Sequence, residues 1–193
     1  MEGIIVDIGT GGGEFVKKLA QEYPDRLFIG IDPSVKPLQR ISRQTSKDPK
    51  KGGLANVLFV LANVKDLPIE LNDSANQVFI NFPWGSLLRG VVVVEESIWL
   101  SIKRICKVGA YIDLVFGYDP VIDQAEIERL GLPALSQSYI DVTMSNRLEN
   151  LGFETVVKKH IESGQLKSYP SGWAKKLAYG RDRDYYYLRL IVR

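Results

Sequence analysis

The sequence predicts an α/β protein in which a mostly parallel, seven-stranded sheet is covered by helices on both faces. Two observations predict this: short apolar runs alternate with segments of helical period, and the last two runs have no helix between them. The alternation requires parallel strands, whereas the final pair indicates an antiparallel last strand. The 193 residues are within the usual size of one domain, and we expect a single domain over 1–193.

Each predicted element follows from its local pattern. Apolar, β-branched runs predict seven strands, at residues 3–8, 26–33, 56–64, 76–82, 110–118, 153–161 and 185–193. Apolar residues at intervals of three or four predict five helices, at residues 14–23, 34–46, 96–109, 123–130 and 136–150. Phe15, Leu19 and Ala20 share one face of the first helix. Trp99 lies on the apolar face of the helix 96–109, so we expect it in the core.

The composition excludes several classes of protein. Cys106 is the only cysteine, so the chain has no disulfide framework, which fits a reducing compartment. His160 is the only histidine, which excludes a multi-histidine metal centre and argues against a Ser-His-Asp triad. No apolar run is long enough to span a bilayer, and Asp7 interrupts the early apolar run. We therefore expect a cytoplasmic protein without a bound metal.

A glycine-rich loop, "DIGTGGG", separates the first strand from the first helix. Glycines let a ligand approach the backbone closely, and the helix N-terminus favours negative charge and hydrogen-bond acceptors. The loop contains Asp7, Gly9, Gly11 and Gly13. Asp32 ends the second strand, where a carboxylate would bind the two hydroxyls of a ribose. The loop and this acid together predict a cofactor that carries a nucleoside.

The spacing of the glycines distinguishes between cofactors. An acid followed by Gly-x-Gly-x-Gly is typical of methyltransferases that use S-adenosylmethionine (SAM), in which the acid serves the amino-acid end of the cofactor. A Gly-Lys-Ser/Thr sequence is absent, which excludes a P-loop. We expect Asn63 and Val64, at the end of the third strand, and Phe82, at the end of the fourth, to complete the cofactor site. The simpler alternative is a tight strand-to-helix turn without a ligand.

The sequence "NFPWGSLL" ends the fourth strand with Pro, Trp and Gly, which cannot continue a strand. In open α/β sheets ligands bind at the carboxyl ends of the strands, so Trp84 lies where a methyl acceptor would bind. A flat base can be held by stacking, and Trp173, in the late loop, can supply its second face. The alternatives are a core or hinge role for Trp84 and loop packing for Trp173.

Positive charge is concentrated in two segments although the net charge is only +2. Residues 36–51 carry one acid and six basic residues: Lys36, Arg40, Arg43, Lys47, Lys50 and Lys51. Residues 167–193 carry two acids and seven basic residues: Lys167, Lys175, Lys176, Arg181, Arg183, Arg189 and Arg193. Such clusters can bind a phosphate backbone or be solvated surface. We interpret the basic loop 47–53 and the long loop 161–179 as insertions that face RNA.

The chain resembles the aminoglycoside-resistance 16S rRNA methyltransferases that modify N1 of adenine 1408 in the decoding site. The resemblance runs nearly end to end, through "DIGTGGG", "IGIDPS", "KGGLANVLFVLA", "FPWGSLL", "GLPALSQSY" and "GWAKKLAYGRDR". It implies a Rossmann-like class I fold, SAM as cofactor, the 30S subunit as partner and a monomeric enzyme. The methylated site would bind drugs of the kanamycin and apramycin type poorly.

The resemblance also implies roles for single residues. Asp7, Gly9 and Gly11 would hold SAM, and Asp32 its ribose. Trp84 and Trp173 would enclose the flipped adenine, with Ser86 near the cofactor and the base. Ser171 would order the late loop. The residues implied to contact rRNA are Lys50, Lys51, Lys176, Arg181 and Arg183.

Other functions stay open at this point. "NFPW" is close to the Asn-Pro-Pro-aromatic motif of amino methyltransferases, so Asn81 could accept a hydrogen bond from an amino group. The enzyme would then methylate adenine N6 or a tRNA base. A relative that binds SAM or rRNA without turnover and a small-molecule methyltransferase are the remaining readings. N1 methylation needs no proton removal, which suits a site without a candidate general base.

Overall fold

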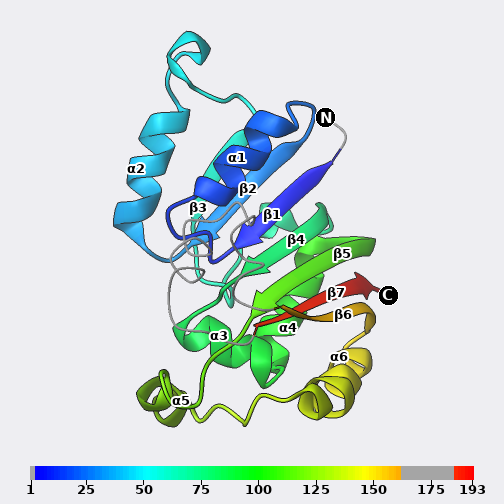
Figure 1. Cartoon of the computed structure of the whole chain (residues 1–193). Helices are drawn as coiled ribbons and strands as arrows, with labels where there is room; N and C mark the ends of the chain where they lie inside the picture. The colour runs from blue at the N-terminus through cyan, green and yellow to red at the C-terminus, as the bar shows by residue number, and fades with distance from the viewer. Residues whose placement is uncertain (1–2, 162–184) are drawn as a thin grey trace.

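The computed structural model describes residues 3–161 and 185–193, which form one mixed sheet with helices on both faces (Figure 1). The strands are β1 (Ile4–Ile8), β2 (Leu27–Asp32), β3 (Val57–Leu61), β4 (Ala75–Asn81), β5 (Cys106–Phe116), β6 (Phe153–Ile161) and β7 (Tyr185–Val192). The α-helices are α1 (Glu14–Glu22), α2 (Val35–Thr45), α3 (Gly85–Val92), α4 (Glu96–Ile105), α5 (Gln124–Leu130) and α6 (Ser145–Asn150). Two 3₁₀ turns and a π-helical segment complete them, at Pro49–Lys51, Ile69–Leu71 and Tyr139–Met144.

The strand order is β3-β2-β1-β4-β5-β7-β6. β7 runs antiparallel to β5 and β6, and the other neighbouring strands are parallel, which confirms the predicted fold class. β1 and β4 lie side by side in the middle of the sheet (Figure 1). The order of the strands along the chain reverses there, so the carboxyl ends of β1 and β4 are the expected place for a ligand.

The two faces of the sheet are buried in two apolar clusters. Val6 and Ile8 of β1 belong to the larger cluster, to which α3 and α4 contribute, whereas Ile5 belongs to the smaller one. On α1, Phe15 and Ala20 are buried as predicted, and the partly buried Leu19 packs against the same cluster. Because both faces of the sheet are covered, the central strands are almost continuously apolar and do not alternate between apolar and polar residues.

The end of α4 differs from the prediction. The helix expected over 96–109 ends at Ile105, and β5 follows directly, so the last predicted turn is wrong. The backbone amides of Asp73 and Ser74 donate to the carbonyls of Arg104 and Ile105. These carbonyls would have accepted the hydrogen bonds of a further turn, so tertiary pairing ends the helix earlier than its apolar pattern does.

Helix α3 has no counterpart among the predicted elements. Its sequence, "GSLLRGVV", is rich in glycine and valine, which are poor helix formers. Leu88, Val91 and Val92 are nevertheless fully buried. A Cβ at Gly90 would lie 2.0 Å from Cδ1 of Ile98, so the glycine permits the close approach of α3 to α4. The burial of α3 therefore outweighs the low helix propensity of its residues. The same packing fixes the position of Trp84, which directly precedes the helix.

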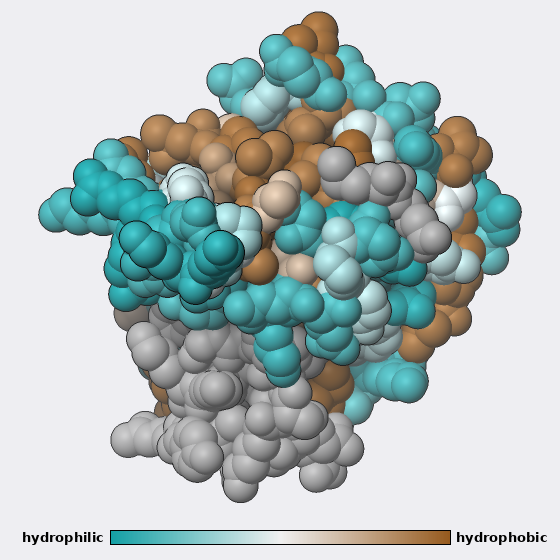
Figure 2. Space-filling view, turned by 90° about the horizontal axis from the view of Figure 1, so that it is seen from above, coloured by the Kyte–Doolittle hydropathy of each residue, from teal (hydrophilic) through white to brown (hydrophobic). Residues whose placement is uncertain are grey.

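Hydrophobic and hydrophilic side chains share the outer surface of the protein. Both kinds gather in several separate areas on the face seen from above (Figure 2). Exposed apolar side chains of the described residues lie on different elements, such as Leu58 in β3, Val108 in β5 and Val121 before α5. Within residues 3–161 and 185–193, no helix has the length and apolarity needed to cross a membrane.

Substitution of Trp99 tests how much the core between α4 and the sheet contributes to stability. Its side chain is fully buried, its Nε1 donates to the Gly90 carbonyl at 3.3 Å, and its ring meets Phe153 edge-on. We expect Trp99→Ala to lower the free energy of unfolding by about 3–5 kcal/mol, measured by urea denaturation and circular dichroism. The half-exposed Trp84 is the control, since Trp84→Ala should cost less than about 1 kcal/mol. Equal losses would contradict this assignment of the core.

Candidate active site

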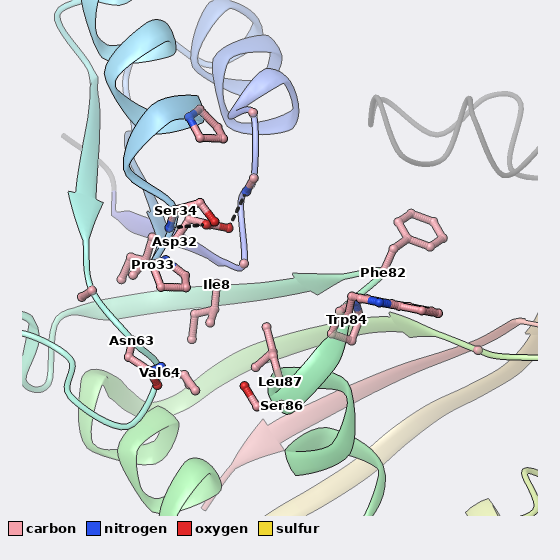
Figure 3. Close-up of a pocket in the computed structure, with 18 of the residues that line it drawn as sticks. Ile8, Asp32, Pro33, Ser34, Asn63, Val64, Phe82, Trp84, Ser86 and Leu87 are labelled. Atoms are coloured by element: carbon pink, nitrogen blue, oxygen red, sulfur yellow. Dashed lines mark hydrogen bonds between the residues drawn. The ribbon is translucent and has the colours of Figure 1, made fainter. Parts of the chain in front are cut away.

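A cavity of about 750 Å³ lies at the carboxyl ends of β1, β2, β4 and β5 (Figure 3). This volume suits a small-molecule cofactor together with part of a substrate. Its lining comes from the glycine loop, from the ends of β2 and β4, and from the segments after β3 and β5. The lining residues are Ile8, Gly9, Gly11, Gly12, Ile31, Asp32, Pro33, Ser34, Pro37, Ala62, Asn63, Val64, Phe82, Pro83, Trp84, Ser86, Leu87, Gly117, Asp123 and Tyr185.

The glycine loop folds over the end of β2. The amide of Gly9 donates to the Ile31 carbonyl at 2.8 Å, and Gly9 and Gly11 adopt positive φ angles of 77° and 55°. A Cβ at Gly9 would lie 2.8 Å from Cδ2 of Leu87 in α3, so glycine is required there. Gly13 is buried and does not line the cavity. A Cβ at Gly13 would crowd Phe59, so its position packs the start of α1 against the sheet.

Asp32 is fixed at the rim of the cavity by the backbone. Its Oδ2 accepts from the amide of Gly11 and its Oδ1 accepts from the amide of Ser34, both at 2.8 Å. Figure 3 shows Asp32, Pro33 and Ser34 together on one side of the cavity. Each carboxylate oxygen keeps a second lone pair, so Asp32 can still accept hydrogen bonds from two ribose hydroxyls.

Asn63 and Val64 lie in the cavity wall after β3. β3 ends at Leu61 rather than at residue 64, so these two residues form a turn instead of the predicted strand end. The Asn63 side chain stabilises the turn by accepting from the amide of Lys65 at 3.0 Å. The ammonium of Lys65 pairs with Glu95, which also pairs with Arg89 of α3. The turn is thereby connected to the helix that follows Trp84.

Trp84 lies on the opposite side of the cavity from Asp32 (Figure 3). It precedes α3, and half of its surface (51%) is exposed, which rules out the core alternative. Phe82 adopts a positive φ of 50°, and its amide donates to the Val115 carbonyl at 2.7 Å. This strained turn redirects the chain from β4 into α3, so that Trp84 and Ser86 both line the cavity.

Asp7 and Asn81 form a pair between the ends of β1 and β4, and neither lines the cavity. Asp7 is 4% exposed, and Nδ2 of Asn81 donates to its Oδ1 at 3.3 Å. Burial raises the pKa of Asp7 to about 7 and the charge of Asp32 adds to the rise, whereas the hydrogen bond from Asn81 opposes it. Because Asn81 does not line the cavity, its position argues against the alternative in which it accepts a hydrogen bond from a substrate amino group.

Asp123 and Tyr185 are among the cavity residues that were not predicted from the sequence. Asp123, just before α5, is 7% exposed, and its Oδ2 accepts from the amide of Asp119 at 2.9 Å. Tyr185 begins β7, and its ring meets Phe82 edge-on. Asp123 lies well beyond Phe116, where β5 ends, so no local sequence signal marks it as a cavity residue. The part of the chain that the structure describes holds no cluster of three or more potential metal-ligating acids, histidines or cysteines.

The first basic segment is exposed and extends from the start of α2, where Ser34 and Pro37 line the cavity, to the turn beyond the other end of this helix (Figure 1). Lys50 and Lys51 lie in the 3₁₀ turn after α2, and the Asp48 side chain fixes this turn by accepting from the Lys50 amide at 2.8 Å. Basic and amide side chains of α2, with Lys47 two residues beyond it, line a shallow groove: Lys36, Gln39, Arg40, Arg43, Gln44 and Lys47. The other predicted site residues lie outside the described residues: Ser171, Trp173, Lys176, Arg181 and Arg183, with most of the loop 161–179.

The sheet order, the glycine loop and the cavity at the carboxyl strand ends together define a class I, SAM-dependent methyltransferase. The family model described as "NpmA: 16S rRNA (adenine(1408)-N(1))-methyltransferase" matches residues 1–192. The chain belongs to this family, and it is therefore an rRNA (adenine-N1) methyltransferase, as the resemblance of its motifs implied.

Individual relatives agree with the family. A 16S rRNA (adenine(1408)-N(1))-methyltransferase of Escherichia coli is 38% identical over 182 residues, which are 94% of this chain and 83% of the relative. The solved aminoglycoside resistance methyltransferase NpmB1 is 34% identical, with a TM-score of 0.84 over 100% of this chain and 88% of that one. A mutant of the enzyme from Catenulisporales acidiphilia, solved with cosubstrate SAM, is 27% identical, with a TM-score of 0.88 over 99% and 86%.

The buried carboxyl of Asp7 predicts how stability depends on pH. Its pKa rises from an ordinary value of 3.8 to about 7, so the folded chain takes up a proton, and stability falls as the pH rises through this range. Asp7→Asn should raise the melting temperature of the ligand-free protein at pH 8 by about 3–8 °C. The gain should shrink as the pH falls toward 4. A gain that does not change with pH would contradict the raised pKa.

Proposed function

We propose that this chain transfers the methyl group of SAM to N1 of adenine 1408 of 16S rRNA in the 30S subunit, with the flipped base stacked on Trp84. The observation that carries the proposal is that Asp32 and the half-exposed Trp84 line opposite sides of one cavity. Ribose-binding and base-stacking groups thus face the same space. The adenine would gain a methyl group and a positive charge. Both would weaken the binding of kanamycin-type and apramycin-type aminoglycosides to the decoding site, which would confer resistance.

The cofactor side of the proposal uses the glycine loop and the ends of β2 and β3. Asp32 accepts from the ribose hydroxyls, and the turn at Asn63 and Val64 lies against the adenine of the cofactor. Gly9 and Gly11 let the cofactor approach the loop, since side chains there would fill the space it needs. Asp7 does not itself line the cavity, and we propose that the ammonium group at the amino-acid end reaches it past Gly9, two residues further along the chain, which does. Phe82 closes the cavity from the end of β4.

The target side uses the start of α3. A base outside its helix has lost its stacking partners, and stacking on an aromatic side chain returns about 1–3 kcal/mol. Trp84 supplies one such surface, and we propose that Trp173 supplies the other. Ser86 lies between the two sides of the cavity, where it orients the base toward the cofactor.

The chemistry needs positioning more than acid–base catalysis. SAM supplies an electrophilic methyl group, and adenine N1 offers a lone pair without a proton to remove. The side chains of the cavity therefore hold the base in line with the methyl group and exclude water. No general base is required, so the proposed reaction does not depend on the carboxylates that line the cavity, Asp32 and Asp123.

The substrate is a large polyanion, so exposed basic residues contribute to docking. Lys50 and Lys51 lie at one end of a surface that continues along α2, and we propose that both contact rRNA phosphates. Ser171, Lys176, Arg181 and Arg183 would contribute from the second basic segment. The enzyme then works as a monomer on 30S subunits, in the cytoplasm.

The proposed function is tested with purified 30S subunits and labelled SAM, with reverse-transcription stops mapped, because N1 methylation blocks reverse transcription. We expect a stop at adenine 1408 with the wild type. Trp84→Ala should reduce kcat/KM for 30S by about 5–150-fold without changing the KM for SAM, since it removes one stacking surface. Trp84→Phe should retain part of the activity. Tyr23→Ala removes an exposed aromatic side chain remote from the cavity and is the control.

Three outcomes would overturn parts of this account. Full activity of Trp84→Ala would contradict the stacking role. Transfer to the subunit without a stop at adenine 1408 would identify another acceptor, such as adenine N6. No transfer to 30S by a wild type that binds SAM would contradict the proposed substrate.

Electrostatic docking is tested by salt dependence. Lys50→Ala combined with Lys51→Ala should weaken 30S binding and reduce the slope of log K against log salt by about 1.5, because two phosphate contacts are lost. Filter binding between 50 and 200 mM salt measures this slope. Lys107→Ala is the control, since this exposed lysine lies in the first part of β5, away from the cavity. An unchanged slope in the double variant would exclude these contacts.

A further inference from the structure

The hydrogen bond between Asn81 and Asp7 connects the two halves of the site. Asp7 is the last residue but one of β1 and leads into the glycine loop, whereas Asn81 ends β4 and leads into Phe82 and Trp84. β1 and β4 are neighbouring parallel strands, with Asp7 opposite Phe79. The contact therefore joins the strand that carries the cofactor loop to the strand that carries the base-stacking segment.

The surroundings of Asp7 give this hydrogen bond a chemical role. Its backbone neighbours are Gly30 on β2 and Phe79 on β4, neither of which carries a charge. Asp32 is the charged group that raises the pKa of Asp7 in addition to burial, and the donor that lowers it is Asn81. A carboxylate in such a place stays ionised only if neighbouring groups donate to it.

We propose that Asn81 is a positioning residue that keeps the Asp7 carboxylate ionised and correctly oriented for the ammonium group of SAM, while it ties the glycine loop to the Phe82–Trp84 segment. The inference rests on the proposed function, because it takes Asp7 as the group that receives the ammonium. It assigns Asn81 to cofactor affinity instead of to recognition of the acceptor base. The described geometry favours this role because the amide is directed at Asp7 and does not line the cavity.

Loss of the donor should act through the protonation of Asp7. Without the hydrogen bond, the pKa of Asp7 rises further, so at pH 7 more of the carboxyl is neutral and cannot pair with an ammonium group. At higher pH the carboxyl ionises again, and the defect becomes smaller. A variant that had only damaged the fold would not recover with pH.

The test measures SAM dissociation constants between pH 6 and pH 9 for the wild type and Asn81→Leu, which has a similar size and no donor. The ratio of the two constants is the quantity to compare, because titration of SAM's own amino group cancels in it. The matched control is Gln77→Leu: Gln77 lies on the same strand, and its Nε2 donates to the buried Asp113 at 2.6 Å, away from the cavity. 5′-Methylthioadenosine, which lacks the amino-acid end, serves as the second ligand.

We expect the ratio for Asn81→Leu to be roughly tenfold at pH 7 and to fall toward two- or threefold at pH 9. Binding of 5′-methylthioadenosine, and SAM binding by Gln77→Leu, should stay within about twofold of the wild type. A ratio near one at every pH, or a loss that is equal at pH 6 and pH 9, would overturn the proposal. So would equal loss of 5′-methylthioadenosine binding.

The result separates this inference from the proposed function. A wild type that binds SAM and methylates adenine 1408, together with an unaffected Asn81→Leu, refutes only the role of Asn81. A wild type that fails to bind SAM refutes the cofactor site itself. Methyl transfer by Asn81→Leu at saturating SAM should show the same product position as the wild type, since Asn81 is not proposed to contact the base.

Discussion

The side-by-side placement of β1 and β4 is the constraint on which the site depends. Because the two strands are parallel, the glycine loop after β1 and the Phe82–Trp84 segment after β4 leave the sheet at the same edge. Two segments far apart in the sequence therefore line one cavity. Helix α3 completes this arrangement, since its burial beneath the sheet fixes the residue before it, Trp84, at the cavity wall. A methyl transfer that depends on alignment requires such a rigid frame.

Between the ends of β1 and β4, residues that suit cofactor binding lower the stability of the ligand-free fold. A buried carboxyl at Asp7 destabilises the ligand-free fold at neutral pH, and a neutral side chain of the same shape would fit more easily. The hydrogen bond that Asn81 donates to it reduces this cost without removing it. The strained turn at Phe82 is a second example, because its left-handed backbone allows the chain to leave β4 toward α3. Both features are costly for folding alone, and the proposed binding roles of Asp7 and Phe82 would account for them.

Much of the fold was predictable because it depends on local patterns. Alternating apolar runs and helical segments predicted the sheet, and the missing helix before β7 predicted its antiparallel end. The glycine loop and Asp32 were likewise found from their spacing. Long-range packing decided the rest: α3 forms despite unfavourable residues, α4 ends where a distant loop takes its carbonyls, and Asp123 reaches the cavity only through the fold. The sequence also left open whether Trp84 was buried, which its neighbours along the chain could not decide.

The central claim is that the base to be methylated leaves the rRNA helix and stacks on Trp84 in the cavity that Asp32 borders. A cryo-electron microscopy structure of the chain on the 30S subunit, with the SAM analogue sinefungin bound, tests it most directly. The account predicts adenine 1408 outside its helix, its ring against the Trp84 indole and its N1 facing the cofactor. An adenine still stacked within the rRNA, or a base held in the cavity away from Trp84, would contradict it.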